Sequence, residues 1–148
     1  MTLTRVADLS DADREALRVL SAAVYPPSDA EWSGAKLEWA AAEWCVRVYG
    51  DDGALLSYVG LSVRDAKCDG RPVRVGGIGG VKTHPTARRR GLAARGMTGA
   101  VEFFRDQGVG FALLVCGPHL LEYYGGLGWR EFSGRLRHGT IDLLGPPW

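Results

Sequence analysis

The sequence predicts an α/β fold of the α+β kind, with a mixed, mostly antiparallel sheet and helices on both of its faces. Alternating apolar segments separated by turn residues fill the first half of the chain and predict an antiparallel meander. A strand, helix and strand pattern follows, and such a crossover joins parallel strands. With 148 residues, 46% of them hydrophobic, the chain can form one core, so we expect a single domain over residues 1–148.

The first helix has the clearest start signal. Ser10 precedes the first apolar repeat and can cap a helix, and Asp13 in the first turn complements the helix dipole. Pro26 and Pro27 end the helix, because proline cannot continue the backbone hydrogen-bond pattern. We therefore expect a helix over residues 11–24.

Turn residues then delimit three strands. The segments 50–53 and 69–70 are rich in glycine and aspartate and predict tight turns. We expect strands over residues 44–49, 54–66 and 72–81. The remaining expected elements are a strand over 3–6, helical turns within 29–42 that cover a cleft, a helix over 92–107, a strand over 111–116, a helix around 120–125, and a strand pair around 129–132 and 137–143.

The second half follows from a change of periodicity. Leu92, Met97, Val101 and Phe104 lie at helical spacing, which predicts the helix over 92–107. A glycine-containing break at residues 108–110 ends this helix, and the short apolar run after it predicts a strand. The two segments supply the crossover that the parallel strand pair requires.

A basic turn joins the strand ending near Val81 to the helix beginning at Leu92. Free backbone N–H groups of residues 89–93 would point at an anion, and the positive end of the helix dipole favours negative charge. Neither a G-x-x-x-x-G-K-[ST] motif nor a G-x-G-x-x-G motif is present. The turn therefore predicts a diphosphate site of another kind.

Two motifs in this half resemble those of the GNAT superfamily of N-acetyltransferases. The sequence Arg88-x-x-Gly91-x-Ala93 is similar to its acyl-CoA pyrophosphate motif, [QR]-x-x-G-x-[GA]. Some thirty residues later, the segment from Leu121 to Trp129 resembles the superfamily's Y-x-x-x-G-[FW] motif. The resemblance implies a GNAT-like sheet in which two central parallel strands splay apart and the pantetheine arm of CoA lies in the gap.

The resemblance also implies the acetyl-CoA site. The residues that it places there are Val81, Lys82, Thr83, Arg88, Arg89, Arg90, Gly91, Leu92 and Ala93. The first three would act through their backbone, unless they are ordinary sheet residues with ladder partners. Acetyl-CoA would be the cosubstrate, and we expect no metal, because the three histidines and three cysteines show no metal-ligand spacing.

The resemblance assigns the catalytic acid to Tyr124, which would protonate the departing CoA thiolate. The alternative is that Tyr124 is an aromatic wall of the pantetheine slot, and Tyr123 is expected to serve packing. Relatives often carry a glutamate on the strand before the phosphate turn, but residues 76–80 contain no carboxylate. The base is therefore left open between water, Glu31 or Glu38, His119, and the carboxylate of Trp148.

The ending of the chain loosely resembles that of aminoglycoside 2'-N-acetyltransferases, in which a C-terminal tryptophan borders the acceptor site. Pro146 and Pro147 would hold Trp148 rigid, so we expect its carboxylate to face the acceptor amine.

The strand before the basic turn contains a cluster of four glycines, Gly76, Gly77, Gly79 and Gly80. Glycine weakens a strand, so the cluster needs a cause. The causes left open are close approach of a ligand, a bulge, or packing of Trp32, Trp39 or Trp44 on the backbone.

These observations lead to one reading and two alternatives. We expect an acetyl-CoA-dependent N-acetyltransferase that moves an acetyl group to a primary amine of a small molecule by direct transfer in a ternary complex. The alternatives are a non-catalytic acyl-CoA or small-ligand binding module, and a protein N-acetyltransferase.

Composition limits the partners and the compartment. The formal net charge of +1 argues against bulk nucleic-acid binding, and no apolar run is long enough to span a membrane. Cys45, Cys68 and Cys116 cannot all pair with one another, and the N-terminus lacks the pattern of a signal peptide. We expect a cytoplasmic protein without nucleic-acid or membrane partners, and a homodimer is left open.

Overall fold

The computed structural model describes residues 1–25, 41–133, 136–138 and 141–143. They belong to two compact units, Met1–Leu114 and Val115–Trp148. The expectation of a single domain over residues 1–148 stays a prediction. The expected helical turns within 29–42 fall almost entirely outside the described residues.

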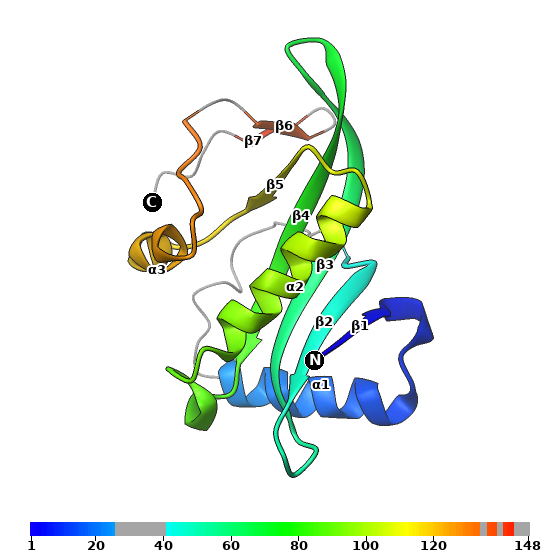
Figure 1. The fold of residues 1–148 in the computed structure, drawn as a ribbon, viewed down its shortest axis with the longest axis vertical. Helices are drawn as coiled ribbons and strands as arrows, with labels where there is room; N and C mark the ends of the chain where they lie inside the picture. Colours follow the sequence, from blue (N-terminus) through cyan, green and yellow to red (C-terminus); the bar gives the residue numbers. More distant parts are fainter. Residues whose placement is uncertain (26–40, 134–135, 139–140, 144–148) are drawn as a thin grey trace. The chain divides into compact units, whose positions relative to one another are not determined.

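The first unit is built on a five-stranded sheet in the order β1-β2-β3-β4-β5 (Figure 1). The strands are β1 (Thr2–Arg5), β2 (Trp44–Tyr49), β3 (Leu55–Cys68), β4 (Arg71–Thr83) and β5 (Phe111–Leu114). Neighbouring strands from β1 to β4 are antiparallel, and β4 and β5 are parallel. The predicted mixed, mostly antiparallel sheet is confirmed.

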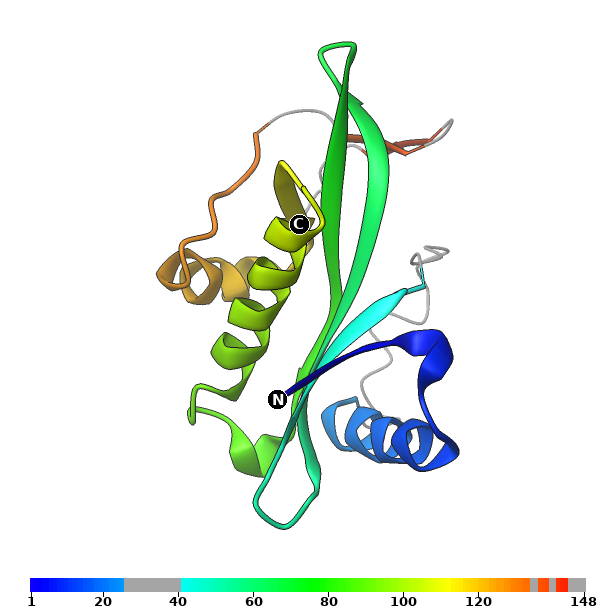
Figure 2. The same ribbon diagram turned by 45° about the vertical axis from the view of Figure 1, so that its right-hand side comes forward.

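Two helices, α1 (Asp11–Val24) and α2 (Leu92–Asp106), cover opposite faces of this sheet (Figure 2). Successive residues of a strand point to opposite faces, and β2 shows the consequence. Cys45 packs in a buried cluster with Leu20 of α1, whereas the next residue, Val46, lies against Gly99 of α2. The expected helices on both faces are therefore present.

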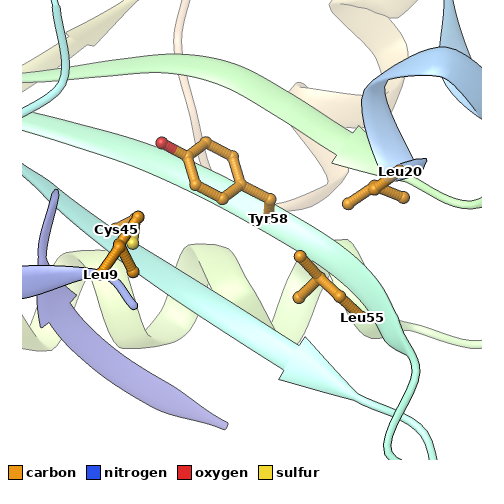
Figure 3. Close-up of a cluster of buried hydrophobic side chains, with 5 residues drawn as sticks. All are labelled: Leu9, Leu20, Cys45, Leu55 and Tyr58. Carbon is orange, nitrogen blue, oxygen red and sulfur yellow. The ribbon is translucent and has the colours of Figure 1, made fainter. Parts of the chain in front are cut away.

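The cluster on the α1 face contains Leu9, Leu20, Cys45, Leu55 and Tyr58, all shown in Figure 3. The Tyr58 ring rises from β3 with its hydroxyl directed away from Leu55. Removal of these side chains from water supplies the main stabilising term for the packing of α1 on the sheet.

The start of α1 is fixed as the sequence predicts. Ser10 accepts a hydrogen bond from the Asp13 backbone N–H at 3.1 Å, and the Asp13 carboxylate accepts the Ser10 backbone N–H at 3.1 Å, which makes a capping box. The same carboxylate forms an ion pair with the buried Arg47 of β2 and accepts the Tyr49 hydroxyl at 3.3 Å. Asp13 thus joins the helix start to the sheet.

The glycine cluster of β4 has two local causes. A Cβ on Gly76 would lie 2.8 Å from the ring of Phe104, so an aromatic side chain of α2 packs closely against this backbone. Gly80 has φ +60° and lies at a register shift between β3 and β4, which is a bulge. The aromatic at Gly76 is thus a phenylalanine, while Trp44 contacts Phe103 instead, with ring centroids 5.1 Å apart. Two other tryptophans considered above, Trp32 and Trp39, lie outside the described residues.

The second unit contains the short 3-10 helix η4 (Pro118–Leu120), the helix α3 (Leu121–Gly126) and a hairpin of β6 (Leu136–His138) and β7 (Ile141–Leu143). The expected strand over 129–132 is wrong. The backbone N–H groups of Leu127 and Trp129 both donate to the Tyr124 carbonyl, at 3.0 and 3.1 Å, so this stretch closes the helix instead of pairing in a sheet. The expected single strand over 137–143 is also wrong, because residues of this stretch belong to two strands, β6 and β7, that pair with each other.

Within the described ranges, no helix is both long and apolar enough to span a bilayer.

Loss of the Asp13 carboxylate should destabilise the fold far more than loss of the Ser10 cap. We expect Asp13→Ala to lower the free energy of unfolding by about 3 kcal/mol, because it leaves the buried Arg47 without its partner. Ser10→Ala removes the cap alone and should cost about 1 kcal/mol. Urea denaturation of the three proteins measures both values, and equal losses in the two variants would contradict the role of the Arg47 pair.

Acid should act through the same carboxylate. Hydrogen bonds from Ser10, and then Arg47, lower the pKa of Asp13 from its ordinary value of 3.8. Its stabilising contribution is therefore complete above that value and is lost as the pH falls through the lowered pKa. We expect the stability difference between wild type and Asp13→Ala to shrink over this acid range, and denaturation at several pH values measures it.

Candidate functional site

The central feature of the site is the point at which β4 and β5 part. The two strands pair from Val75 with Phe111 to Ile78 with Leu114. Beyond Ile78, β4 continues to Thr83 and pairs with β3 alone among the described strands. One backbone edge of β4 after Ile78 is thus left without a strand partner in the described part of the chain.

The hydrogen bonds of this stretch show which groups face the open edge. The His84 N–H donates to Leu56 O at 2.8 Å, and Lys82 O accepts the Ser57 hydroxyl at 2.9 Å, so both positions face β3. Alternation along an extended strand then directs the backbone groups of Thr83 away from β3. The Arg88 Nε donates to Thr83 O at 3.4 Å on that side. An extended ligand could pair with such an edge as an added strand does.

A compact turn leads from this strand end to α2. The 3-10 turn η3 (Pro85–Ala87) begins with the His84 ring, whose Nδ1 accepts the Thr86 N–H at 3.3 Å. Ala87 is buried with Val48 and Leu92 and holds the turn against the sheet. Arg88, Arg89 and Arg90 follow and are exposed.

The start of α2 has the geometry of an anion site. Arg89 and Gly91 both adopt left-handed backbone conformations, with φ of 62° and 72°. Gly91 caps the helix without a side chain, and the bond from Arg95 N to Gly91 O at 3.0 Å is that of the first full turn. The N–H groups of Leu92 and Ala93 precede it, and the first turn carries no acidic residue. Positive potential therefore gathers at this end.

Space for a ligand lies directly at the cap. A Cβ built on Gly91 meets no heavy atom within 4 Å. The open volume, the positive helix end and the exposed arginines fit a diphosphate.

Lys82 lies beside this edge, but its side chain is directed to the α1 face of the sheet. Its Nζ donates to Ser21 Oγ of α1 at 3.0 Å and stands 5.3 Å from the Tyr58 ring centroid and 5.9 Å from that of Tyr25. Burial lowers the pKa of the Lys82 ammonium, and burial raises the pKa of Tyr58 to about 12. Sequence reasoning gave Lys82 a backbone role and missed this side chain, although alternation along residues 81–83 could have indicated it.

The predicted catalytic tyrosine lies in the second unit. Tyr124 of α3 is 8% exposed, and its ring meets the edge of the Tyr123 ring with centroids 5.1 Å apart. Tyr123 is 42% exposed, and its packing contact agrees with the expectation for it. The tyrosine of the motif is thus the buried member of the pair.

The candidate bases are spread over the chain. His119 is exposed at the end of η4. Glu31, Glu38 and Trp148 lie outside the described residues.

Neither a metal centre nor a cysteine nucleophile emerges from this structure. In the ranges that the structure describes, no three His, Cys, Asp or Glu side chains gather as metal ligands would. Cys45, Cys68 and Cys116 are free thiols. Burial raises the pKa of Cys45 and of Cys116, which disfavours the reactive thiolate.

Comparison with known proteins identifies the family. A family model described as an acetyltransferase (GNAT) domain matches residues 5–132. The chain belongs to the GNAT acetyltransferases. A search of curated proteins gives no match for this GNAT acetyltransferase.

Solved structures share the GNAT fold with this chain. An acetyltransferase from Trypanosoma brucei has a TM-score of 0.65 at 22% identity, over 94% of this chain and 99% of that one. The aminoglycoside N-acetyltransferase AAC(6')-Iy in complex with CoA has a TM-score of 0.65 at 17% identity, over 94% and 93%. Glucosamine-6-phosphate N-acetyltransferase from Arabidopsis thaliana has a TM-score of 0.57 at 12% identity, over 66% and 67%. At these identities the likeness concerns the fold.

Proposed function

We propose that this GNAT acetyltransferase is an acetyl-CoA-dependent N-acetyltransferase that acts on a primary amine of a small molecule by direct transfer in a ternary complex. One observation carries the proposal: the open edge of β4 runs directly into a helix start that presents free N–H groups and arginines. Acetyl-CoA has an extended pantetheine arm that leads to a diphosphate, and these two parts match the strand edge and the helix start in order. Two of the structural neighbours are also named as N-acetyltransferases of amine-bearing small molecules, an aminoglycoside and glucosamine 6-phosphate.

Acetyl-CoA would bind through the turn and the strand together. Its diphosphate would accept hydrogen bonds from the backbone N–H groups of Gly91, Leu92 and Ala93. The side chains of Arg88, Arg89 and Arg90 would surround it. Each hydrogen bond to a charged oxygen contributes roughly 1.5–3 kcal/mol. The pantetheine arm would pair with the backbone of Val81 and Thr83. The backbone of Lys82, which was also expected to bind the arm, faces β3 instead, and its side chain lies on the other face of the sheet.

The chemistry requires one bond to form and one to break. The neutral acceptor nitrogen attacks the thioester carbonyl carbon, the C–N bond forms, the C–S bond breaks and the nitrogen gives its extra proton to water. We propose that the Tyr124 hydroxyl protonates the leaving thiolate. A phenol of pKa ~10 donating to a thiolate whose conjugate acid has pKa ~8.5 runs uphill by about 2 kcal/mol, and exclusion of water reduces this cost. The burial of Tyr124 in α3 supports the role.

A strong base is not needed for this step. For an acceptor amine of pKa near 8, about a tenth is neutral at pH 7, which costs roughly 1.4 kcal/mol. The reaction also needs no partner beyond acetyl-CoA and the amine, which fits a cytoplasmic enzyme without nucleic-acid or membrane partners.

Binding of acetyl-CoA should depend on Gly91. We expect saturating acetyl-CoA to raise the Tm of the wild type, whereas ATP and NAD should not. At a hundredfold excess over Kd, binding adds about 2.7 kcal/mol to the free energy of unfolding. Gly91→Val should abolish the shift, because valine strains a backbone at φ 72° and fills the open space at the cap. Differential scanning fluorimetry measures it.

Gly108→Val is the matched control for this prediction. Gly108 has φ +65° and equally open space, but it follows α2 instead of preceding it. Gly108→Val should lose comparable stability and keep the acetyl-CoA shift. An unchanged shift in Gly91→Val would remove the diphosphate site from the proposal.

Tyr124→Phe should reduce kcat about 10²-fold with little change in acetyl-CoA affinity, because it removes only the proton donor. Tyr123→Phe, its exposed neighbour, is the control and should retain wild-type kcat. Steady-state kinetics with the best acceptor of an amine panel measures both variants. Unchanged turnover in Tyr124→Phe would contradict the acid role, and an equal loss of turnover and affinity would indicate a binding wall.

A further inference from the structure

The ammonium of Lys82 is half-buried and lacks an opposite charge in the part of the chain that the structure describes. The ion pairs there are those of Arg18 with Glu15, Arg47 with Asp13, Arg64 with Glu43 and Arg74 with Asp65, and none includes Lys82. Its hydrogen bond goes to a neutral hydroxyl, that of Ser21, at 3.0 Å. An ammonium has three N–H donors, so two of them remain for a ligand.

Two aromatic rings lie near the Lys82 ammonium, and no ion pair of the described residues includes it. The faces of Tyr25 and Tyr58 lie 5.9 and 5.3 Å from Nζ, which is cation–π distance. On the same face of the sheet, the Asp13 carboxylate is engaged by the buried Arg47. Among the described residues, the positive charge of Lys82 thus has no carboxylate partner.

The Lys82 ammonium lies on the face of the sheet from which the acceptor amine would approach. The turn at Gly91 leads to α2, so the diphosphate end of acetyl-CoA belongs to the α2 face. Lys82 lies on the open stretch of β4 and extends to the opposite, α1 face. An acceptor that approaches the strand edge from the face that CoA leaves free meets Lys82. Tyr25, which is 53% exposed, marks the solvent side of this approach.

We propose that the Lys82 side chain binds an anionic group of the acceptor, a carboxylate or a phosphate, so that the substrate is a small amine carrying its own negative charge. This inference rests on the proposed N-acetyltransferase function and names its substrate class. A charge-assisted hydrogen bond would hold the anion, and Lys82 would repel a polycationic acceptor. The strand glutamate that could attract such a polycation is absent from residues 76–80.

Matched amine pairs test this proposal. The acceptors are β-alanine against β-alaninamide, and glucosamine 6-phosphate against glucosamine, so that the two arms distinguish carboxylate from phosphate. Wild type should favour the anionic member of at least one pair by about tenfold or more in kcat/KM, with the difference in KM. Release of CoA measures the rates.

Three variants separate anion binding from a structural tie between α1 and β4. Lys82→Gln keeps a polar contact for Ser21. It should bring the ratio of kcat/KM between the anionic and the neutral acceptor close to one. Lys82→Arg retains the charge and should retain much of the preference. Lys67→Gln removes an exposed lysine near the end of β3 and should leave the preference unchanged, which controls for net charge.

Calorimetric titration of the same four compounds into the CoA-saturated enzyme gives a readout that does not require turnover. Absence of an anionic preference in both pairs, or a preference that survives in Lys82→Gln, would overturn the proposal. Failure of the underlying function is seen separately, because wild type would then show no thermal shift with acetyl-CoA.

Discussion

The site depends on one constraint, which is that β4 continues past the last residue that β5 pairs with it. A strand edge normally satisfies its N–H and C=O groups with a neighbouring strand. After Ile78, β4 has such a neighbour only on the β3 side among the described strands. The Gly80 bulge lies at the same point and re-aims the backbone. The parting of two parallel strands therefore leaves a backbone edge at which a ligand could bind.

The remaining features of the candidate site follow from where this edge leads. The strand passes through a turn that Ala87 anchors in the core and becomes α2 at a glycine cap. An unpaired strand edge and an unpaired helix start are thus consecutive, and one ligand can satisfy both. The three adjacent arginines are exposed, and their mutual repulsion would fall if the proposed diphosphate bound between them.

Much of this was accessible from the sequence because it is encoded locally. The Ser10 cap, the turns of the meander and the glycine at the start of α2 depend on neighbouring residues, and they were predicted. The failures depend on contacts that the residue pattern of a single segment does not reveal. Phe104 covers Gly76 from another element, and the Tyr124 carbonyl takes the N–H of Trp129 and prevents a strand there. Alternation along residues 81–83 could have indicated the face that the Lys82 side chain takes, but its contacts require α1, β3 and β4 together.

The charges on the α1 face are the basis of the proposed substrate class. The Asp13 carboxylate forms an ion pair with Arg47 and also completes the cap of α1, so its charge is engaged by these groups. Lys82 has no ion pair within the described ranges and lies near two tyrosine rings. A GNAT fold with a carboxylate on this strand attracts ammonium groups, whereas a lysine beside the edge attracts anions and disfavours a protonated amine. The acceptor nitrogen would accordingly meet a local potential that favours its neutral, nucleophilic form, which reduces the need for a dedicated base.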